Sequence, residues 1–172
     1  MRILLLLLLL PFCFNARSQS FIHQWEGNWK GELQWTKPGD KNPQKVMMQL
    51  RIHPGSVNNT WSWQMIYGED EKDNRPYLLL PRDTTGTHWV IDEQNGIVMD
   101  QYWVGNKFCG VFAVMGNTII NNIWMQNGEL QVEFISYISE PLTKSGKGTE
   151  ESPNVLSYRI GGYQYAVLKR VK

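Results

Sequence analysis

The sequence predicts an all-β protein: a single antiparallel up-and-down β-barrel of about ten strands, with no substantial helix in residues 19–172. Short runs of aromatic and β-branched residues alternate with Gly, Asn, Asp and Pro, and many of them repeat with a period of two. Several runs are separated by only two turn-forming residues, which makes neighbours antiparallel because parallel strands need long crossovers. Ten such strands in an open sheet would leave free edges, so we expect closure into a barrel. The alternative, a two-sheet sandwich, normally needs longer crossing connections.

The composition is that of a globular protein with a hydrophobic core. The 172 residues are 42% hydrophobic and 19% charged, with a net charge of +1. A charge so near zero gives no reason to expect a nucleic-acid partner. The aromatic content stands out, with eight Trp, seven Tyr and six Phe.

The first 18 residues match a secretory signal peptide. Arg2 supplies a positive charge, an aliphatic run covers Ile3 to Leu10, and Ala16 and Ser18 are small residues at a cleavage site. The run is too short to cross a bilayer, so a membrane-spanning anchor is not expected. We therefore predict cleavage after Ser18 and an exported domain, secreted or periplasmic, over residues 19–172.

Cleavage would change the chemistry of the remaining chain. Loss of Arg2 and Arg17 leaves 15 basic against 16 acidic residues, a net charge of −1. Cys109 becomes a single thiol without an internal disulfide partner. Lipidation of Cys13 is the alternative, but the bulky Phe12 before it departs from a lipoprotein cleavage site.

Ten strands follow in order along residues 19–172. Tight turns are expected at Gly105-Asn106, Gly116-Asn117 and Asn127-Gly128, and a bulge at Gly161-Gly162 in the last strand. The expected strands are 28–36, 46–53, 60–67, 75–81, 86–92, 97–104, 107–115, 118–126, 129–137 and 155–169.

The long connections are predicted to gather at one end. In an up-and-down barrel alternate connections share an end, which places 37–45, 68–74 and 139–154 together. The opposite end carries shorter links, so we expect one open mouth and a closed base. The segment 139–154 is polar and rich in Gly and Pro, and we predict a mobile loop there.

An open barrel of this kind holds a small apolar or aromatic ligand without a covalent bond. Arg75 is expected near the mouth, where it could meet an anionic group. The same rings could instead fill the barrel, leaving a module that acts through protein contacts or self-association. For that alternative we expect Met99, Trp103, Val111 and Met125 on the outer face. The predicted ligand-binding lining is Trp61, Trp63, Met65, Arg75, Tyr77, Trp89, Tyr102, Phe112 and Phe134.

Motifs for metal binding or catalysis are missing from the sequence. His23, His53 and His88 lack ligand spacing, so no metal or cofactor is predicted. Cys109 has no local base that would make it a nucleophile. Asp92 and Asp100 could pair across a hairpin, although turn capping is the commoner role. A binding protein is therefore expected rather than an enzyme, with a site at the barrel mouth as the enzyme alternative.

Two short sites resemble the calycins, the superfamily of lipocalins, fatty-acid-binding proteins and avidins. Gly27 and Trp29 form the Gly-x-Trp pattern that opens the first lipocalin strand. In that family a basic residue near the end of the last strand packs over the Trp, and Arg170, beside Lys169, stands in that region. The resemblance implies a ligand-binding barrel closed by Gly27, Trp29 and Arg170.

The chain also departs from each calycin branch. The lipocalin Thr-Asp-Tyr motif has only a loose echo in Asp100-Gln101-Tyr102, and no helix pattern follows the last strand. The segment 37–45 is too short for the helical lid of fatty-acid-binding proteins. No His follows His88, so haem bound as in nitrobindin-type barrels is not expected.

Overall fold

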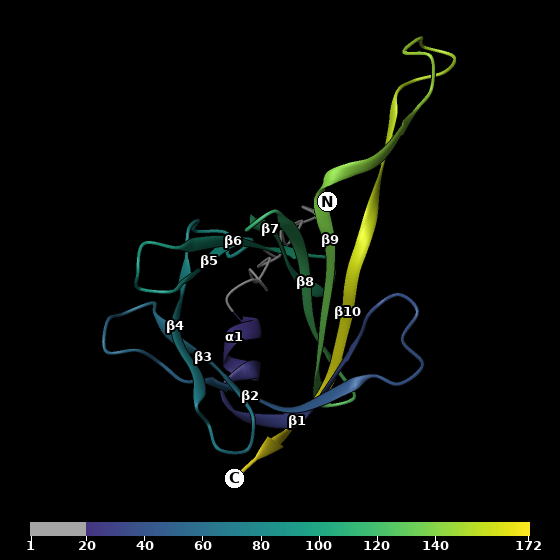
Figure 1. Cartoon of the computed structure of the whole chain (residues 1–172). Coiled ribbons are helices and arrows are strands. Elements are labelled where there is room, and N and C mark those ends of the chain that lie inside the picture. The colour runs from purple at the N-terminus through teal and green to yellow at the C-terminus, as the bar shows by residue number, and fades with distance from the viewer. Residues whose placement is uncertain (1–19) are drawn as a thin grey trace, which may run out of the picture.

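A computed structural model describes residues 20–172, which form ten antiparallel strands and one short helix (Figure 1). The predicted signal peptide, residues 1–18, and the alternative lipid site Cys13 lie outside the described residues. The elements are α1 (Ser20–Trp25), β1 (Gly27–Thr36), β2 (Gln44–Ile52), β3 (Trp61–Tyr67), β4 (Asp73–Pro81), β5 (His88–Asp92), β6 (Val98–Val104), β7 (Lys107–Val114), β8 (Asn117–Gln126), β9 (Glu129–Ser145) and β10 (Val155–Val171).

The strands close into a barrel in simple sequence order. Each strand pairs antiparallel with its chain neighbours, and β1 pairs with β10 to complete the ring, from Asn28 opposite Val171 to Thr36 opposite Tyr163. The predicted all-β up-and-down barrel of ten strands is confirmed. Closure pairs the sheet edges that an open sheet of this size would expose.

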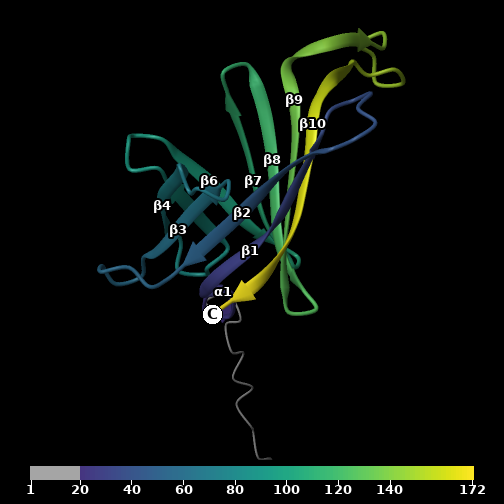
Figure 2. The same ribbon diagram turned by 60° about the horizontal axis from the view of Figure 1, so that its bottom comes forward.

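One end of the barrel, here called the base, is filled. It carries α1 and the connections 53–60, 82–87, 105–106 and 127–128. Figure 2 shows α1 and the C-terminus together at this end. Phe21 of α1 stacks on Trp103 at 4.5 Å between ring centroids and meets Phe108 at 5.5 Å. Trp25, also of α1, is 1% exposed and lies 6.4 Å from the ring of Trp63.

Aliphatic side chains complete this core. Met48, Leu50 and Ile52 of β2 are fully buried at alternate positions, as the period of two predicts. They face Leu130 and Leu168, also fully buried, within the same cluster as the aromatic rings. Large packed rings and branched side chains in contact fill the centre of the base. A small pocket of about 120 Å³ remains at its edge, beside Trp61 and Trp89.

The opposite end, here called the mouth, carries the connections 37–43, 68–72, 93–97, 115–116 and 146–154. The three connections predicted to share an end do so. The predicted loop 139–154 is corrected, however, because β9 continues to Ser145 and pairs with β10 from Val155 onward. Only 146–154 is a loop, and its turn is held by the bond from Lys147 N to Ser152 O, 3.0 Å.

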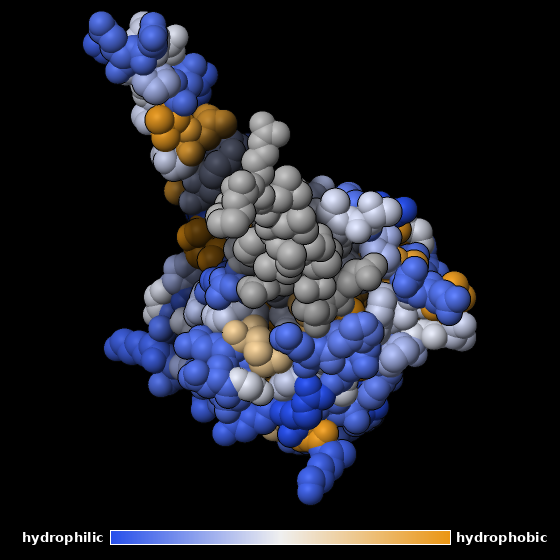
Figure 3. Space-filling view, turned by 180° about the vertical axis from the view of Figure 1, so that it is seen from behind, coloured by the Kyte–Doolittle hydropathy of each residue, from blue (hydrophilic) through white to orange (hydrophobic). Residues whose placement is uncertain are grey.

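These extra residues form an arm, residues 139–160, that projects beyond the barrel (Figures 1 and 2). The register shifts between Ile160 and Gly162, at the predicted Gly161-Gly162 bulge. Apolar side chains gather on the arm (Figure 3), where they are 40–54% exposed. They are Leu142, Val155, Leu156, Tyr158 and Ile160.

The predicted outer patch of four apolar residues is wrong for three of them. Met99, Trp103 and Met125 point inward and pack against the core. Only Val111, 62% exposed, faces outward. Met99 and Trp103 share the inner face of β6 with Gln101, and Met125 continues the inner positions of Asn121 and Ile123 on β8. Within residues 20–172, no helix is long and apolar enough to cross a membrane.

Candidate functional site

A cavity of about 490 Å³ occupies the mouth half of the barrel, above the aromatic base. β3 to β10 all contribute to its wall. The lining residues are Trp63, Met65, Tyr67, Arg75, Tyr77, Ile91, Glu93, Ile97, Val98, Met99, Gln101, Phe112, Ala113, Val114, Ile119, Asn121, Ile123, Phe134, Ser136 and Gln164.

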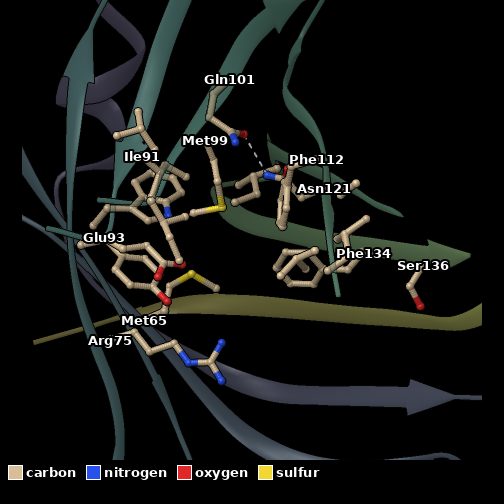
Figure 4. A pocket seen from close by; sticks show the side chains of 18 of the residues that line it. Met65, Arg75, Ile91, Glu93, Met99, Gln101, Phe112, Asn121, Phe134 and Ser136 are labelled. Carbon is tan, nitrogen blue, oxygen red and sulfur yellow. Dashed lines mark hydrogen bonds between the residues drawn. The ribbon is translucent and has the colours of Figure 1, made fainter. Parts of the chain in front are cut away.

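The middle of the cavity is apolar and aromatic. Figure 4 shows the thioethers of Met65 and Met99 and the rings of Phe112 and Phe134 around one space. Ile91 adds a branched side chain beside them. Flat rings and flexible thioethers give a surface that accepts planar apolar molecules.

Charged groups stand at the rim of the cavity. Arg75 lies at the mouth, as predicted, with its guanidinium 4.9 Å from the ring centroid of Tyr67. It is already engaged, because Nε and Nη2 donate to the two oxygens of Asp73 at 2.8 and 2.9 Å. This pairing lowers the pKa of Asp73 and raises that of Arg75. An anionic ligand would therefore meet a cation whose charge Asp73 already partly neutralises.

Two tyrosines beside Arg75 stay protonated. Burial raises the pKa of Tyr67, and burial together with the negative charge of Glu93 raises the pKa of Tyr77. Both phenols thus remain neutral hydrogen-bond donors across the physiological range. The rim therefore combines one cation, Arg75, two carboxylates, Asp73 and Glu93, and two neutral donors.

Deeper in the cavity lies a pair of amide side chains. Gln101 of β6 is completely buried and Asn121 of β8 is 4% exposed. Asn121 Nδ2 donates to Gln101 Oε1 at 2.9 Å, the bond drawn in Figure 4. The other atom of each amide, Gln101 Nε2 and Asn121 Oδ1, has no hydrogen-bond partner among the described residues.

Gly110 of β7 makes room for this pair. It lies between the two amides in the wall, and a Cβ atom at this position would collide with both side chains. The backbone here is an ordinary strand, so the absence of a side chain serves the amides rather than a turn.

The structure brings together six of the nine predicted lining residues. These are Trp63, Met65, Arg75, Tyr77, Phe112 and Phe134, which line the cavity. Trp61 and Trp89 belong to the packed base, where their rings lie 5.7 Å apart. Neither lines the cavity.

The prediction that Tyr102 points inward is wrong. Its side chain lies on the outer face, 47% exposed, and stacks on His88 at 4.5 Å. Inward and outward positions alternate along β6, so Gln101 and Trp103 take the inner positions that flank it.

Four residues that line the cavity were not predicted from the sequence to do so: Glu93, Met99, Gln101 and Asn121. From the sequence alone, Gln101 and Asn121 are expected on the surface, since polar side chains on a strand usually face water. Gly110 was the available signal, because a glycine within a strand marks a close approach of neighbouring groups.

The residues of the Gly-x-Trp resemblance meet at the base. Arg170 lies over the Trp29 ring at 4.4 Å and donates from Nη2 to Gln24 O at 2.8 Å and from Nη1 to Glu26 O. Gly27 has a φ of 129°, and a Cβ there would collide with the guanidinium of Arg170. Trp29 is 1% exposed, and its Nε1 donates to Trp25 O at 2.7 Å.

The carboxylate pair considered from the sequence does not form. Asp92 and Asp100 do not pair, because Asp92 caps the turn by accepting from Gln94 N at 2.7 Å and Asp100 contacts His88 Nε2 at 2.7 Å on the outer face. Burial raises the pKa of Cys109, which disfavours its thiolate. Residues 20–172 contain no group of three His, Cys, Asp or Glu side chains placed to hold a metal ion.

Solved structures share this antiparallel barrel fold. Neither a family model nor a curated protein matches the sequence. A protein of unknown function of the DUF3598 family from Nostoc punctiforme is similar, with a TM-score of 0.63 and 12% identity over 87% of this chain. The chain spans about half, 49%, of that protein.

An S-type phycobiliprotein lyase, CpeS from Guillardia theta, is also similar. Its TM-score is 0.54 at 11% identity, and the alignment covers 90% of this chain and 92% of the lyase. Identities this low establish a common fold and nothing finer.

Proposed function

We propose that this protein is an exported lipocalin-like binding protein that holds a small apolar or aromatic molecule non-covalently in the mouth half of its barrel. The observation that carries the proposal is the cavity of about 490 Å³. Ligand pockets span roughly 300–1,000 Å³ and are lined by apolar groups with a few polar ones, as here.

The division of the barrel into two halves supports this function. The base holds the fully buried rings of Trp25, Trp29 and Trp63, so the barrel has a packed core outside the cavity. A solvent-open space lined by Phe112, Phe134 and Met99 leaves apolar surface in water, which burial of a ligand would relieve.

The rim offers hydrogen-bonding partners to a polar part of the ligand. Arg75 and the phenols of Tyr67 and Tyr77 lie where a molecule in the cavity would leave the barrel. Because Arg75 is paired with Asp73, its positive charge is already partly neutralised, and an anionic group gains less from it than from a free guanidinium. An uncharged aromatic ligand is therefore accepted as well.

The proposal is tested by titrating the purified chain 19–172 with a small panel. Tryptophan emission reports binding, since Trp63 lines the cavity. The panel contains anilinonaphthalene sulfonate, retinol, oleate and biliverdin. Biliverdin is included because one structural neighbour is a phycobiliprotein lyase. Saturable quenching at one-to-one stoichiometry is the expected result for at least one compound.

A matched pair of variants locates the site. Ile119 lines the cavity, whereas Ile120, the next residue of β8, does not. Ile119→Trp is expected to weaken binding at least tenfold in calorimetry, and Ile120→Trp to leave it unchanged. Absence of binding across the panel, or equal effects of the two variants, contradicts a ligand site in the barrel.

Export is tested separately. The signal segment is expected to be removed, so the N-terminal sequence of the protein recovered outside the cytoplasm should begin at Gln19. A chain that retains Met1 and stays in the cytoplasm contradicts export without touching the ligand proposal.

A further inference from the structure

We propose that the Gln101–Asn121 amide pair recognises a lactam, or an equivalent group with neighbouring donor and acceptor, at the deep end of an aromatic ligand. This inference rests on the binding function proposed above and specifies the chemistry of its ligand. It starts from the two unpaired atoms in the cavity wall, Gln101 Nε2 and Asn121 Oδ1.

Burial makes these atoms costly unless a partner reaches them. The exposed fractions of Gln101 and Asn121 are 0% and 4%. A buried polar group without a partner destabilises the folded protein, and the two side chains satisfy each other through one bond only. Both residues line the cavity. The two unpaired atoms are themselves shielded, so a molecule in the cavity supplies their missing partners once the amide ends turn toward it.

The pair offers one donor and one acceptor side by side. Gln101 Nε2 donates and Asn121 Oδ1 accepts. Rotating both amides by half a turn exchanges their oxygen and nitrogen atoms but again leaves one donor and one acceptor. The complement is therefore fixed as a neighbouring acceptor and donor on the ligand, which a lactam carries in its C=O and N–H.

The same geometry excludes a carboxylate at this depth. A carboxylate would place its second oxygen against Asn121 Oδ1, and like acceptors repel. The cation of the cavity, Arg75, stands at the mouth instead. An acidic ligand group is thus directed outward and the lactam inward, with the apolar body between Phe112 and Phe134.

Gly110 shows that the wall is shaped around these amides. A side chain at this mid-strand position would collide with Gln101 and with Asn121. An apolar pair at 101 and 121 would pack without such a gap and leave no polar atom unpaired. The glycine thus gives the two amides the room they occupy within the wall.

The test compares phenanthridinone, a flat aromatic lactam, with benzochromenone, its lactone isostere. The two differ only in N–H against ring oxygen. Calorimetry on the chain 19–172 is expected to show the lactam binding about 10- to 100-fold more tightly, because the lactone leaves Asn121 Oδ1 facing an acceptor. In NMR, the side-chain amide resonances of Gln101 are expected to shift with the lactam.

The double variant Gln101→Met/Asn121→Leu removes the donor and the acceptor together. It is expected to bring the two affinities within about twofold while still binding both compounds. Asn122→Leu is the control, since Asn122 bonds to Glu133 on the outer face, and it should keep the wild-type ratio. If the double variant does not fold, the wild-type ratio and the Gln101 resonances decide.

Equal affinity of the wild type for lactam and lactone overturns the inference, as does a preference that persists in the double variant. Binding of anilinonaphthalene sulfonate without binding of phenanthridinone overturns it too, and leaves the proposed function standing. Failure of every panel compound to bind overturns the proposed function itself.

Discussion

Arg170→Met is expected to weaken the barrel closure by about 2 kcal/mol. The guanidinium donates to the backbone carbonyls of Gln24 and Glu26 and covers the ring of Trp29 at 4.4 Å. Hydrogen bonds contribute about 0.5–1.5 kcal/mol each and an exposed cation–π contact about 0.5–1 kcal/mol, and we take the lower half because Arg170 is exposed. Methionine keeps the apolar stem, so the loss isolates the guanidinium.

Urea unfolding followed by tryptophan emission measures the loss in the free energy of unfolding. Thermal unfolding is the second measurement, because 2 kcal/mol corresponds to a fall of roughly 4–8 °C in the midpoint of a chain of about 150 residues. Lys169→Met is the control, because Lys169 is 74% exposed and lies 3.6 Å from Glu129. A surface pair of this kind is worth about 0–1 kcal/mol. Equal losses in the two variants would refute a closing role for Arg170.

Three further predictions concern the periphery of the barrel. Hydrogen bonds, first that from the Thr87 hydroxyl, lower the pKa of Asp83 to about 2. Its stabilising effect is therefore full above about pH 5 and fades toward pH 2, so Asp83→Asn should lower the urea midpoint at pH 7 but not at pH 2. Cys109, whose pKa burial raises, should react with iodoacetamide at pH 7 more slowly in the folded protein than in urea, and equal rates would contradict its burial. Replacing residues 142–157 of the arm with an Asn-Gly turn should change the thermal midpoint by less than about 2 °C, since these side chains are nearly all exposed, and a larger fall would show that the arm supports the barrel.

The fold followed from the sequence because most strands carry an unambiguous alternation. In β3, Trp61, Trp63, Met65 and Tyr67 occupy every second position, and all four face inward. One apolar face and a two-residue turn fix both register and direction.

The inner face of β6 could not be predicted from the sequence. Tyr102 and Trp103 are adjacent aromatic residues, so alternation alone does not say which of them is buried. The decision depends on Gln101, which a sequence assigns to water but which the structure buries against Asn121. Because Gln101 and Asn121 bond to each other, a polar residue takes an inner position of β6 and the aromatic Tyr102 takes an outer one.

Two other differences between the predicted and the observed elements, the arm and the helix α1, have physical reasons. The arm has solvent on both faces, so its strands lack the apolar alternation that marks a buried face, and the polar segment 139–145 read as loop. The helix α1 has six residues, too few for a helical period to appear, and packing of Phe21 and Trp25 against the base stabilises it.

The most direct test of the account is a crystal structure of the chain 19–172 with the tightest ligand of the panel. Ligand density is expected among Met65, Phe112 and Phe134, with the rings of Trp25 and Trp63 unmoved at the base. Density on the outer face or on the arm, or a mouth half closed by its own side chains, would contradict a barrel that is packed below and hollow above.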